Sequence, residues 1–184
     1  MIHSKKIIVV GTSCAGKTSF AKKFSLYSSI THFDLDDLHW LPNWVEREDK
    51  YFLQDVSQNI LTLQSWLVSG NYLSLTKDSL WKEADTIIWL NYNLPTVLWR
   101  YIKRSYKRVI LKEPCCNGNY ETFRHAFFSS ESMLLWILKT YNKRKEMFKI
   151  LQNGTFAHKN WIEFNYPKEA NSFIKNLSDA ANEH

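Results

Sequence analysis

The strongest constraint on how this chain folds is the stretch GTSCAGKT at residues 11–18. It follows the apolar run KKIIVV and fits the pattern G-x-x-x-x-G-K-[ST] at every fixed position. A strand that leads into a glycine-bearing turn and then a helix points backbone N–H groups toward bound phosphate. A strand–turn–helix corner without a ligand is the alternative, and the complete motif behind an apolar run argues against it. We therefore predict that this stretch, the phosphate loop, binds a nucleotide.

The residue types in the phosphate loop have distinct expected roles. Gly11 and Gly16 permit the turn and a close approach of phosphate to the backbone. Lys17 is expected to reach the β- and γ-phosphates, and Thr18 to coordinate Mg²⁺. We therefore expect ATP and Mg²⁺ to bind here. The predicted nucleotide-binding residues are Gly11, Thr12, Ser13, Cys14, Ala15, Gly16, Lys17, Thr18 and Ser19.

Length and composition limit the class of protein. A chain of 184 residues suits one domain, which we expect to span residues 1–184. No apolar run approaches the ~20 residues of a membrane span, and too few apolar residues precede the phosphate loop for a signal peptide. The three cysteines show no CxxC spacing, so we expect reduced thiols in a cytoplasmic protein that has no membrane partner.

Hydrophobic patterning predicts an α/β fold. Apolar, β-branched runs that suit buried strands occur at residues 6–10, 31–34, 65–69, 86–90 and 160–164. Helical periodicity occurs at residues 16–27, 46–63, 94–111, 130–151 and 167–177. Strands that are apolar on both faces are typical of a parallel sheet covered by helices, so we predict a doubly wound sheet. The polar stretch between the two helices that precede the last strand is predicted to be a lid, at about residues 112–130.

Acidic residues follow the second predicted strand, in FDLDDLHWLPNW. Ligands of open α/β sheets bind at the carboxyl ends of the strands. An extended D-x-D sends both carboxylates to one side, so Asp34 and Asp36 are predicted to face the substrate. One carboxylate could hold Mg²⁺ through water, which we expect of Asp34, while Asp36 could accept a proton from a substrate hydroxyl. A turn and helix-cap cluster is an equal alternative.

Further substrate residues are expected around these carboxylates. Trp40 and Trp44 could stack on a base or ring, or they could form a hydrophobic cover on the next helix. The SGNYL stretch after the third strand offers a glycine for close approach and two hydrogen-bonding side chains. The remaining predicted substrate residues are Arg47, Gly70, Asn71 and Tyr72. His39 lies nearby in the sequence, and we expect it at the surface.

A basic stripe lies on the predicted helix 94–111, where arginines recur every four residues between lysines. A solvated helix face is the usual explanation for such a stripe. Phosphoryl transfer, however, requires cations near the equatorial phosphate oxygens, and lids commonly supply arginines. We therefore predict catalytic roles for Arg104, Arg108 and, beyond them, Arg124, with the other cations left to solvent.

Several stretches together resemble a known family. They are GTSCAGKT, LDDLHWLPNW, WLVSGNY, ADTIIWLN, GNYETFRHAFF and LLWILKTYNKR, and they span residues of about 5 to 150. The chain resembles the P-loop kinases similar to adenylate kinase, and most closely the DNA topology modulation (FlaR-like) group. The resemblance implies a three-layer, nucleoside-monophosphate-kinase-like fold with a five-stranded parallel sheet of order 2-3-1-4-5, a mobile lid, and Mg-ATP at the phosphate loop.

The resemblance also bears on the acceptor. Asp36 matches the group's acid after the second strand, and Gly70 stands where adenylate kinases have a glycine that lines the monophosphate pocket. Asn71 and Tyr72 replace the arginine that adenylate kinases carry shortly after that glycine, which argues against AMP as the acceptor. Asn91 stands where many relatives have an acid after the fourth strand, which argues against a metal ligand there.

Three functions remain open at the level of sequence. The first is an ATP-dependent kinase whose partners are a nucleotide and a small-molecule acceptor. The second is an ATP-binding, nucleic-acid-associated regulator, suggested by the net charge of +6 and the basic stripe, although no DNA-binding motif appears. The third is nucleotide binding without catalysis, which would require Asp36 to be turned away from the site. Neither the acceptor nor the oligomeric state follows from the sequence.

Overall fold

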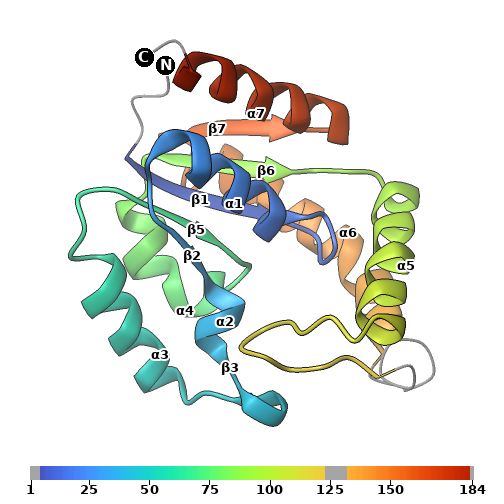
Figure 1. The fold of residues 1–184 in the computed structure, drawn as a ribbon. Helices are drawn as coiled ribbons and strands as arrows, with labels where there is room; N and C mark the ends of the chain where they lie inside the picture. The colour runs from blue at the N-terminus through green and yellow to red at the C-terminus, as the bar shows by residue number, and fades with distance from the viewer. Residues whose placement is uncertain (1–4, 123–131, 183–184) are drawn as a thin grey trace.

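A central parallel sheet organises the computed structural model, which describes residues 5–122 and 132–182 (Figure 1). Its strands, in spatial order, are β2, β5, β1, β6 and β7. Their bounds are Lys6–Gly11 (β1), His32–Asp34 (β2), Trp66–Ser69 (β5), Thr86–Leu90 (β6) and Asn160–Phe164 (β7). Numbered among these five strands alone, the order is 2-3-1-4-5. The predicted α/β class and strand order are therefore confirmed.

The central strands are apolar on both faces because helices cover both faces of the sheet. All four residues of β5 and all five of β6 are buried, whereas β2, at one edge, is only partly buried. Alternate residues of β1 enter different clusters, with Ile7 and Val9 on one face and Ile8 and Val10 on the other. The run IIVV therefore contributes side chains to the hydrophobic cores on both faces of the sheet.

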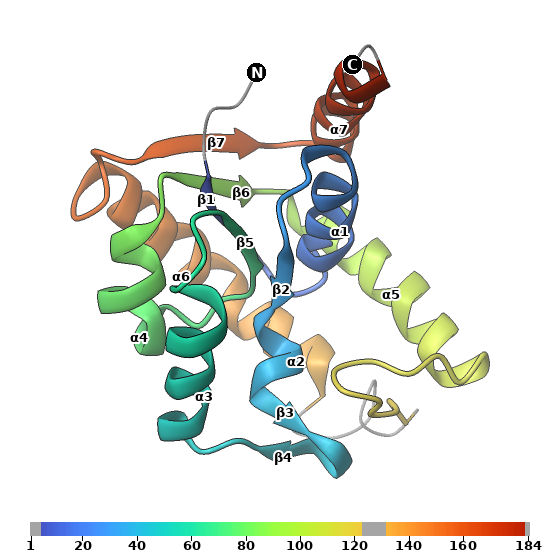
Figure 2. The same ribbon diagram turned by 60° about the vertical axis from the view of Figure 1, so that its left-hand side comes forward.

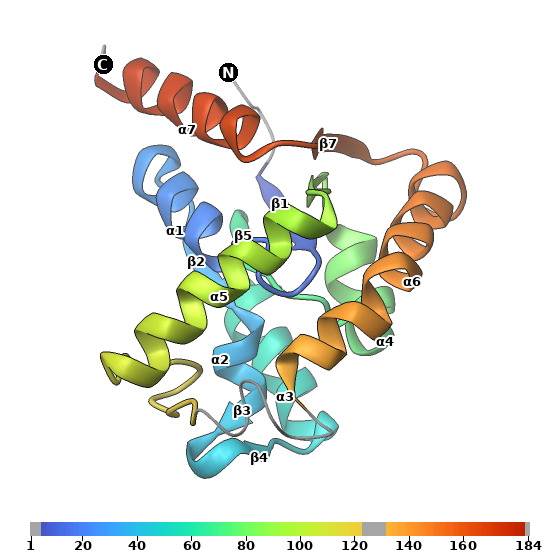
Figure 3. The same ribbon diagram turned by 90° about the vertical axis from the view of Figure 1, so that its right-hand side faces the viewer.

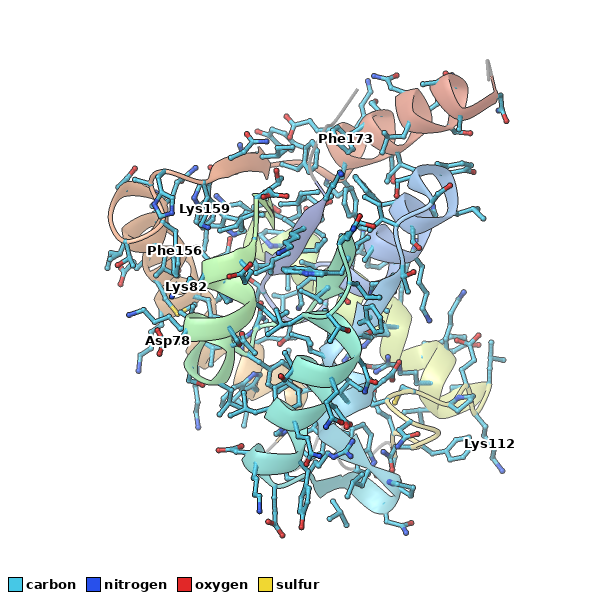
Figure 4. All side chains as sticks on the ribbon, turned by 90° about the vertical axis from the view of Figure 1, so that its left-hand side faces the viewer. Asp78, Lys82, Lys112, Phe156, Lys159 and Phe173 are labelled. Carbon is cyan, nitrogen blue, oxygen red and sulfur yellow. The ribbon has the colours of Figure 1, made fainter. Side chains whose placement is uncertain are left out.

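The helices form the two outer layers (Figures 1 and 2). One core cluster includes residues of α1, α5 and α7, which span Lys17–Ser28, Leu94–Ile110 and Pro167–Asn182. The other includes residues of α3 (Asp49–Asp55) and of two π-helical turns, η2 (Val56–Ile60) and η3 (Lys77–Trp81); η3 follows α4 (Leu73–Thr76). Helix α6 (Met133–Asn153) contributes to both clusters. Phe173 packs against the first cluster and Phe156 belongs to the second (Figure 4).

The segment between β2 and α3 differs from the prediction. The helix expected over residues 46–63 begins at Asp49, because the preceding residues form a short antiparallel hairpin. Its strands, β3 (Trp40–Leu41) and β4 (Val45–Glu46), flank the 3₁₀ turn η1 (Pro42–Trp44). A short helix, α2 (Leu35–His39), connects β2 to this hairpin. Helical periodicity cannot reveal a hairpin with two-residue strands, because one alternation is too short to register.

The described part of the predicted lid, residues 112–122, turns back through a bridge between Cys115 and Asn119. It reaches from the end of α5 toward α2 and the hairpin (Figure 2). Asn119 joins the two parts, because its Nδ2 donates to Leu41 O at 3.0 Å and its Oδ1 accepts from Trp44 N at 2.9 Å. The rest of the expected lid, including Arg124, lies outside the described residues. No helix within residues 5–122 and 132–182 is long and apolar enough to cross a membrane.

A pair of identical substitutions tests the assignment of the core. Ile88 on β6 is fully buried, whereas Ile150 on α6 is 71% exposed. We expect Ile88→Ala to lower the free energy of unfolding by about 2–5 kcal/mol, because it leaves a cavity in the core cluster on that face of the sheet. Ile150→Ala should change it by no more than about 0.5 kcal/mol. Urea denaturation followed by circular dichroism measures both; equal losses would contradict the burial of Ile88.

Candidate active site

A cavity of about 1420 Å³ opens where the phosphate loop meets α2, α5, the lid segment and α6. Residues from all of these elements line it, so segments that are far apart in the sequence share one site. The predicted site residues that line it are Ser13, Cys14, Gly16, Lys17, Thr18, Ser19, Asp34, Asp36, Trp40, Trp44, Asn71, Tyr72, Arg104 and Arg108. Gly11, Thr12, Ala15, Arg47 and Gly70 do not line it.

The phosphate loop adopts a conformation that requires its glycines. Gly16 precedes the first residue of α1 and has φ of 93°, in the left-handed region. A Cβ on Gly16 would collide with the guanidinium of Arg100. A Cβ on Gly11 would lie 2.7 Å from Leu90 O on the neighbouring strand. The loop therefore lies close to the Arg100 side chain of α5 on one side and to the backbone of β6 on the other.

Lys17 lies half-buried in the loop with only backbone acceptors. Its Nζ donates to Gly11 O at 3.3 Å and to Thr12 O at 3.5 Å. Burial lowers the pKa of Lys17, although Asp36 acts in the opposite direction. Among the described residues no carboxylate forms an ion pair with it. A partly desolvated ammonium without a carboxylate partner favours an anionic ligand, and a glycine turn at a helix N-terminus lets phosphate approach the backbone. Together these features suit the binding of a polyphosphate.

Asn71 supports the phosphate loop from the neighbouring strand end. Its Nδ2 donates to Gly11 O at 2.7 Å, and its Oδ1 accepts from Gly11 N at 3.4 Å. The side chain thus pairs with both polar groups of the first loop glycine. The sequence analysis assigned Asn71 to the substrate; the structure shows its amide already engaged by the loop, although Asn71 also lines the cavity.

Asp34 lies beside Thr18, at the start of α2. Its carboxylate accepts hydrogen bonds from Asp36 N, at 3.2 Å, and from the Thr18 hydroxyl. Burial raises the pKa of Asp34, and the neighbouring Asp36 raises it further. Asp34 therefore caps a helix, as one alternative expected, and it also lines the cavity, so its role toward a metal ion or substrate stays a prediction.

The donor set at Thr18 and Asp34 suits Mg²⁺ only in part. Hydroxyl and carboxylate oxygens are the hard ligands that Mg²⁺ prefers, and Mg²⁺ commonly takes its other ligands from phosphates and water. Within the described part of the chain, no group of three or more His, Cys, Asp or Glu side chains could hold a metal ion by itself. The residues present therefore fit a cation that arrives with a nucleotide.

Asp36 faces the cavity and is fixed by Tyr72. The Tyr72 hydroxyl donates to Asp36 Oδ1 at 2.8 Å. Burial raises the pKa of Tyr72, and the Asp36 carboxylate raises it further, so the phenol stays protonated as a donor. No described residue donates a hydrogen bond to Asp36 Oδ2. The third function, nucleotide binding alone, required Asp36 to be turned away, but Asp36 lines the cavity.

The two predicted catalytic arginines meet an acid from the lid. Arg108 Nη1 lies 2.5 Å from Glu121 Oε1, and Arg104 Nη2 lies 3.4 Å from the same oxygen. The Glu121 side chain is only 11% exposed. Sequence reasoning did not single out Glu121, because a lone acid in a polar loop has no distinctive spacing. Arg124, the third predicted arginine, lies outside the described residues.

Of the predicted aromatic and basic substrate residues, the two tryptophans line the cavity and the arginine does not. Trp40 and Trp44 meet edge to face, with 5.6 Å between their ring centroids. Trp44 Nε1 donates to Tyr120 O at 3.1 Å, so this ring also holds the lid. Arg47 pairs with Asp55 at 2.6 Å and does not line the cavity. Gly70 does not line the cavity but packs closely under α2, since a Cβ there would lie 2.9 Å from Leu35 Cβ.

Other residues line the cavity without having been assigned to the site. Arg100 was left to solvent, yet it contacts the phosphate loop at Gly16. His39 was expected at the surface, yet it lines the cavity beside Tyr72, with 4.9 Å between ring centroids. Arg144, on α6, was part of a quoted motif but had no assigned role. Of these three residues, only Arg100 could have been found from the sequence, because it belongs to the basic stripe of residues 94–111.

Comparison with known proteins supports the fold. No protein-family model matches the chain, and no curated protein matches it in sequence. Among solved structures, the chain is similar to a sugar kinase from Janibacter sp. HTCC2649 (TM-score 0.52, 13% identity) and to a gluconokinase from Sinorhizobium meliloti 1021 (TM-score 0.53, 14% identity). Each match covers 97% of this chain and 92% of the other. The chain has the P-loop kinase fold. At these identities the likeness shows the fold alone and does not single out the FlaR-like group.

The raised pKa of Asp34 predicts a pH-dependent stability. The folded chain binds a proton at Asp34 more tightly than the unfolded chain, whose aspartate pKa is about 3.9. The stability that this group contributes is therefore fully present below that value and is lost as pH rises through the folded pKa. We expect the melting temperature of Asp34→Asn, minus that of the wild type, to increase from acidic to neutral pH. Thermal denaturation in EDTA without nucleotide measures it.

The control for this experiment is Asp78→Asn, at an exposed residue on η3 (Figure 4). Its melting temperature should follow that of the wild type across the same pH range. A difference for Asp34→Asn that is flat, or that shrinks as pH rises, would contradict the burial of an ionisable carboxyl at this position.

The Asn71 amide predicts a second experiment. In Asn71→Asp a carboxylate replaces the donor and faces Gly11 O, so the loop loses its support and gains a repulsion. We expect ATP to bind about tenfold more weakly or worse, since leaving a partly buried polar group unpaired costs about 1–3 kcal/mol. Calorimetric titration measures the Kd. Unchanged ATP affinity together with an impaired acceptor KM would instead support the substrate role that the sequence suggested.

Proposed function

We propose that this protein is an ATP-dependent phosphotransferase that phosphorylates a hydroxyl group of a small molecule. The observation that carries the proposal is that Lys17 and Asp36 line one cavity, with Asp36 Oδ2 not engaged by any described donor. A phosphate-binding lysine and a carboxylate that can accept a proton are the two groups that a small-molecule kinase requires.

The residues divide the chemistry between them. The loop N–H groups and Lys17 hold the phosphates of ATP, and Mg²⁺, when bound, neutralises charge on the phosphate oxygens. The acceptor oxygen attacks the γ-phosphorus, the bond to the β–γ bridging oxygen breaks, and the hydroxyl proton passes to Asp36 Oδ2. Tyr72 keeps Oδ1 occupied, which orients Oδ2 toward the acceptor. Arg104 and Arg108 supply positive charge near the transferred group.

Two further observations favour a small hydroxylated acceptor. Two of the similar solved structures are a sugar kinase and a gluconokinase, and neither name indicates a nucleotide acceptor. In this chain the side chains after Gly70 serve other groups, because Asn71 binds the loop and Tyr72 binds Asp36. Adenylate kinases carry an arginine near this position, and neither Asn71 nor Tyr72 supplies a positive charge in its place. This difference argues against AMP as the acceptor.

The nucleic-acid-associated alternative loses its main support. Its motive was the basic stripe of α5, but Arg100, Lys103, Arg104, Lys107 and Arg108 all line the cavity. Their charge is therefore directed at the proposed nucleotide site. Membership of the FlaR-like group remains a proposal that rests on the sequence motifs quoted above.

The test is an ATP-turnover assay with a panel of nucleoside monophosphates, sugars, polyols and sugar acids. We expect one class of hydroxylated acceptor to stimulate turnover in the wild type, and Lys17→Ala to abolish it. Asp36→Asn should lower kcat by about 10²- to 10⁴-fold, the usual contribution of a general base. Asp78→Asn, a matched substitution at an exposed residue, should have no effect. Turnover that no acceptor stimulates, or that ignores Lys17, would refute the proposal.

A further inference from the structure

The Glu121 carboxylate lies where the two predicted catalytic arginines converge. Its Oε1 is 2.5 Å from Arg108 Nη1 and 3.4 Å from Arg104 Nη2. All three side chains line the cavity that the phosphate loop also lines. Glu121 belongs to the lid segment, which turns back from the end of α5 toward α2 (Figure 3). A carboxylate of the protein therefore already occupies cations that face the proposed nucleotide site.

Contacts within the fold place these arginines on the side of the phosphate loop. The Arg100 guanidinium fills the space beside Gly16, so this part of α5 touches the loop. Ala15 of the loop and Tyr101 of α5 also belong to one core cluster. Because residues four apart lie on one face of a helix, Arg104 and Arg108 continue the face that Arg100 directs at the loop.

The contact between Glu121 and the arginines leaves polar atoms unpaired. Both arginines approach Oε1, whereas Oε2 is buried and has no hydrogen-bond partner within residues 5–122 and 132–182. Arg104 Nε is also buried without a partner in those ranges. A well-matched pair of arginine and carboxylate uses both oxygens in two parallel hydrogen bonds. A phosphoryl group offers three oxygens around one centre, so it suits two converging arginines better than Glu121 does.

We propose that Glu121 is an internal competitor for the phosphates of the nucleotide, which must displace its carboxylate from Arg104 and Arg108 in order to bind. This inference rests on the proposed function, because it takes these two arginines as the cations that serve the transferred phosphate. Two anions on the same partly buried cations repel each other, so the Glu121 contact and phosphate binding exclude one another.

The lid segment allows this displacement without being lost from the structure. Asn119 and Tyr120, which precede Glu121, are hydrogen-bonded to Leu41 and Trp44 of the hairpin. Release of Glu121 therefore frees only the side of the lid segment that contacts α5. A ligand that also engages the phosphate loop gains enough further contacts to offset the broken ion pairs, so the empty site is guarded against weaker anions.

The experiment measures binding, so that it does not depend on turnover. Mg-ATP and inorganic triphosphate are titrated calorimetrically into the wild type and into Glu121→Gln, which keeps the size of the side chain but removes its charge. We expect Glu121→Gln to bind both ligands about tenfold more tightly, because a charged contact no longer has to be broken first. The melting temperature of the free variant establishes that it is folded.

Three further variants serve as controls. Glu113→Gln removes the same charge from an exposed acid of the same lid segment, which lines the cavity but forms no ion pair within the described ranges. It should change either Kd by less than about twofold. In an Arg108→Gln background the gain from Glu121→Gln should shrink, because the shorter of its two contacts is already absent. Glu121→Asp retracts the carboxylate, so it should give a smaller gain and serves if Glu121→Gln does not fold.

The outcomes separate this inference from the proposed function. It is overturned if Glu121→Gln binds Mg-ATP no more tightly than the wild type, or more weakly, since Glu121 would then hold the arginines in place for phosphate. It is also overturned if Glu113→Gln gives the same gain or if the gain is undiminished without Arg108. Tighter binding in Glu121→Gln without acceptor-stimulated turnover supports the inference and refutes the kinase. Acceptor-stimulated turnover with unchanged nucleotide binding retains the kinase and refutes the inference.

Discussion

The carboxyl end of β1 is confined on both sides, and the rest of the site depends on this confinement. Gly11 ends the strand between β5 and β6, where Leu90 O leaves no room for a side chain and Asn71 pairs with the Gly11 peptide groups. The chain leaves the sheet through this narrow gap and turns at Gly16 into α1. Because both neighbours confine the end of the strand, the turn that follows it has a fixed starting point, and Lys17 lines the cavity.

Charge is arranged around that turn in two separate groups. On α5, Arg104 and Arg108 share the Glu121 carboxylate of the lid segment, so their positive charge is partly neutralised when the lid is in place. Burial alone would lower the pKa of Arg108, but Glu121, together with the nearby Cys115 and Cys116, more than offsets burial and raises that pKa. On the other wall, the Tyr72 hydroxyl donates to the Asp36 carboxylate, so that a phenol and an acid meet beyond the ends of β5 and β2. Partial burial strengthens each of these interactions relative to water.

The lid segment, residues 112–122, forms hydrogen bonds and ion pairs with elements on both sides of the cavity. Glu121 contacts α5, while Asn119 and Tyr120 contact the β3–β4 hairpin and Asn117 N donates to Asp37 Oδ1 at 3.1 Å. The same short stretch thus contacts the wall of the arginines and the wall of the acceptor residues. The hairpin, which no periodicity indicated, provides the surface on which the lid lies. Trp44 therefore has a dual position, in the cavity lining and in the lid contact.

The sequence alone determined the strands, most of the helices, the phosphate loop and its required glycines, because alternation, helical periodicity and turn chemistry are local. The strand order followed from a resemblance and was confirmed by the sheet. What only the tertiary structure decided is which distant residues meet: Asn71 with Gly11, Tyr72 with Asp36, and Glu121 with Arg108. These partners lie 60, 36 and 13 residues apart. The first two pairs meet because a parallel sheet brings the carboxyl ends of its strands together whatever their separation in the sequence. Local patterns carry no record of that proximity, which is why Asn71 was predicted for the substrate and Glu121 was not singled out.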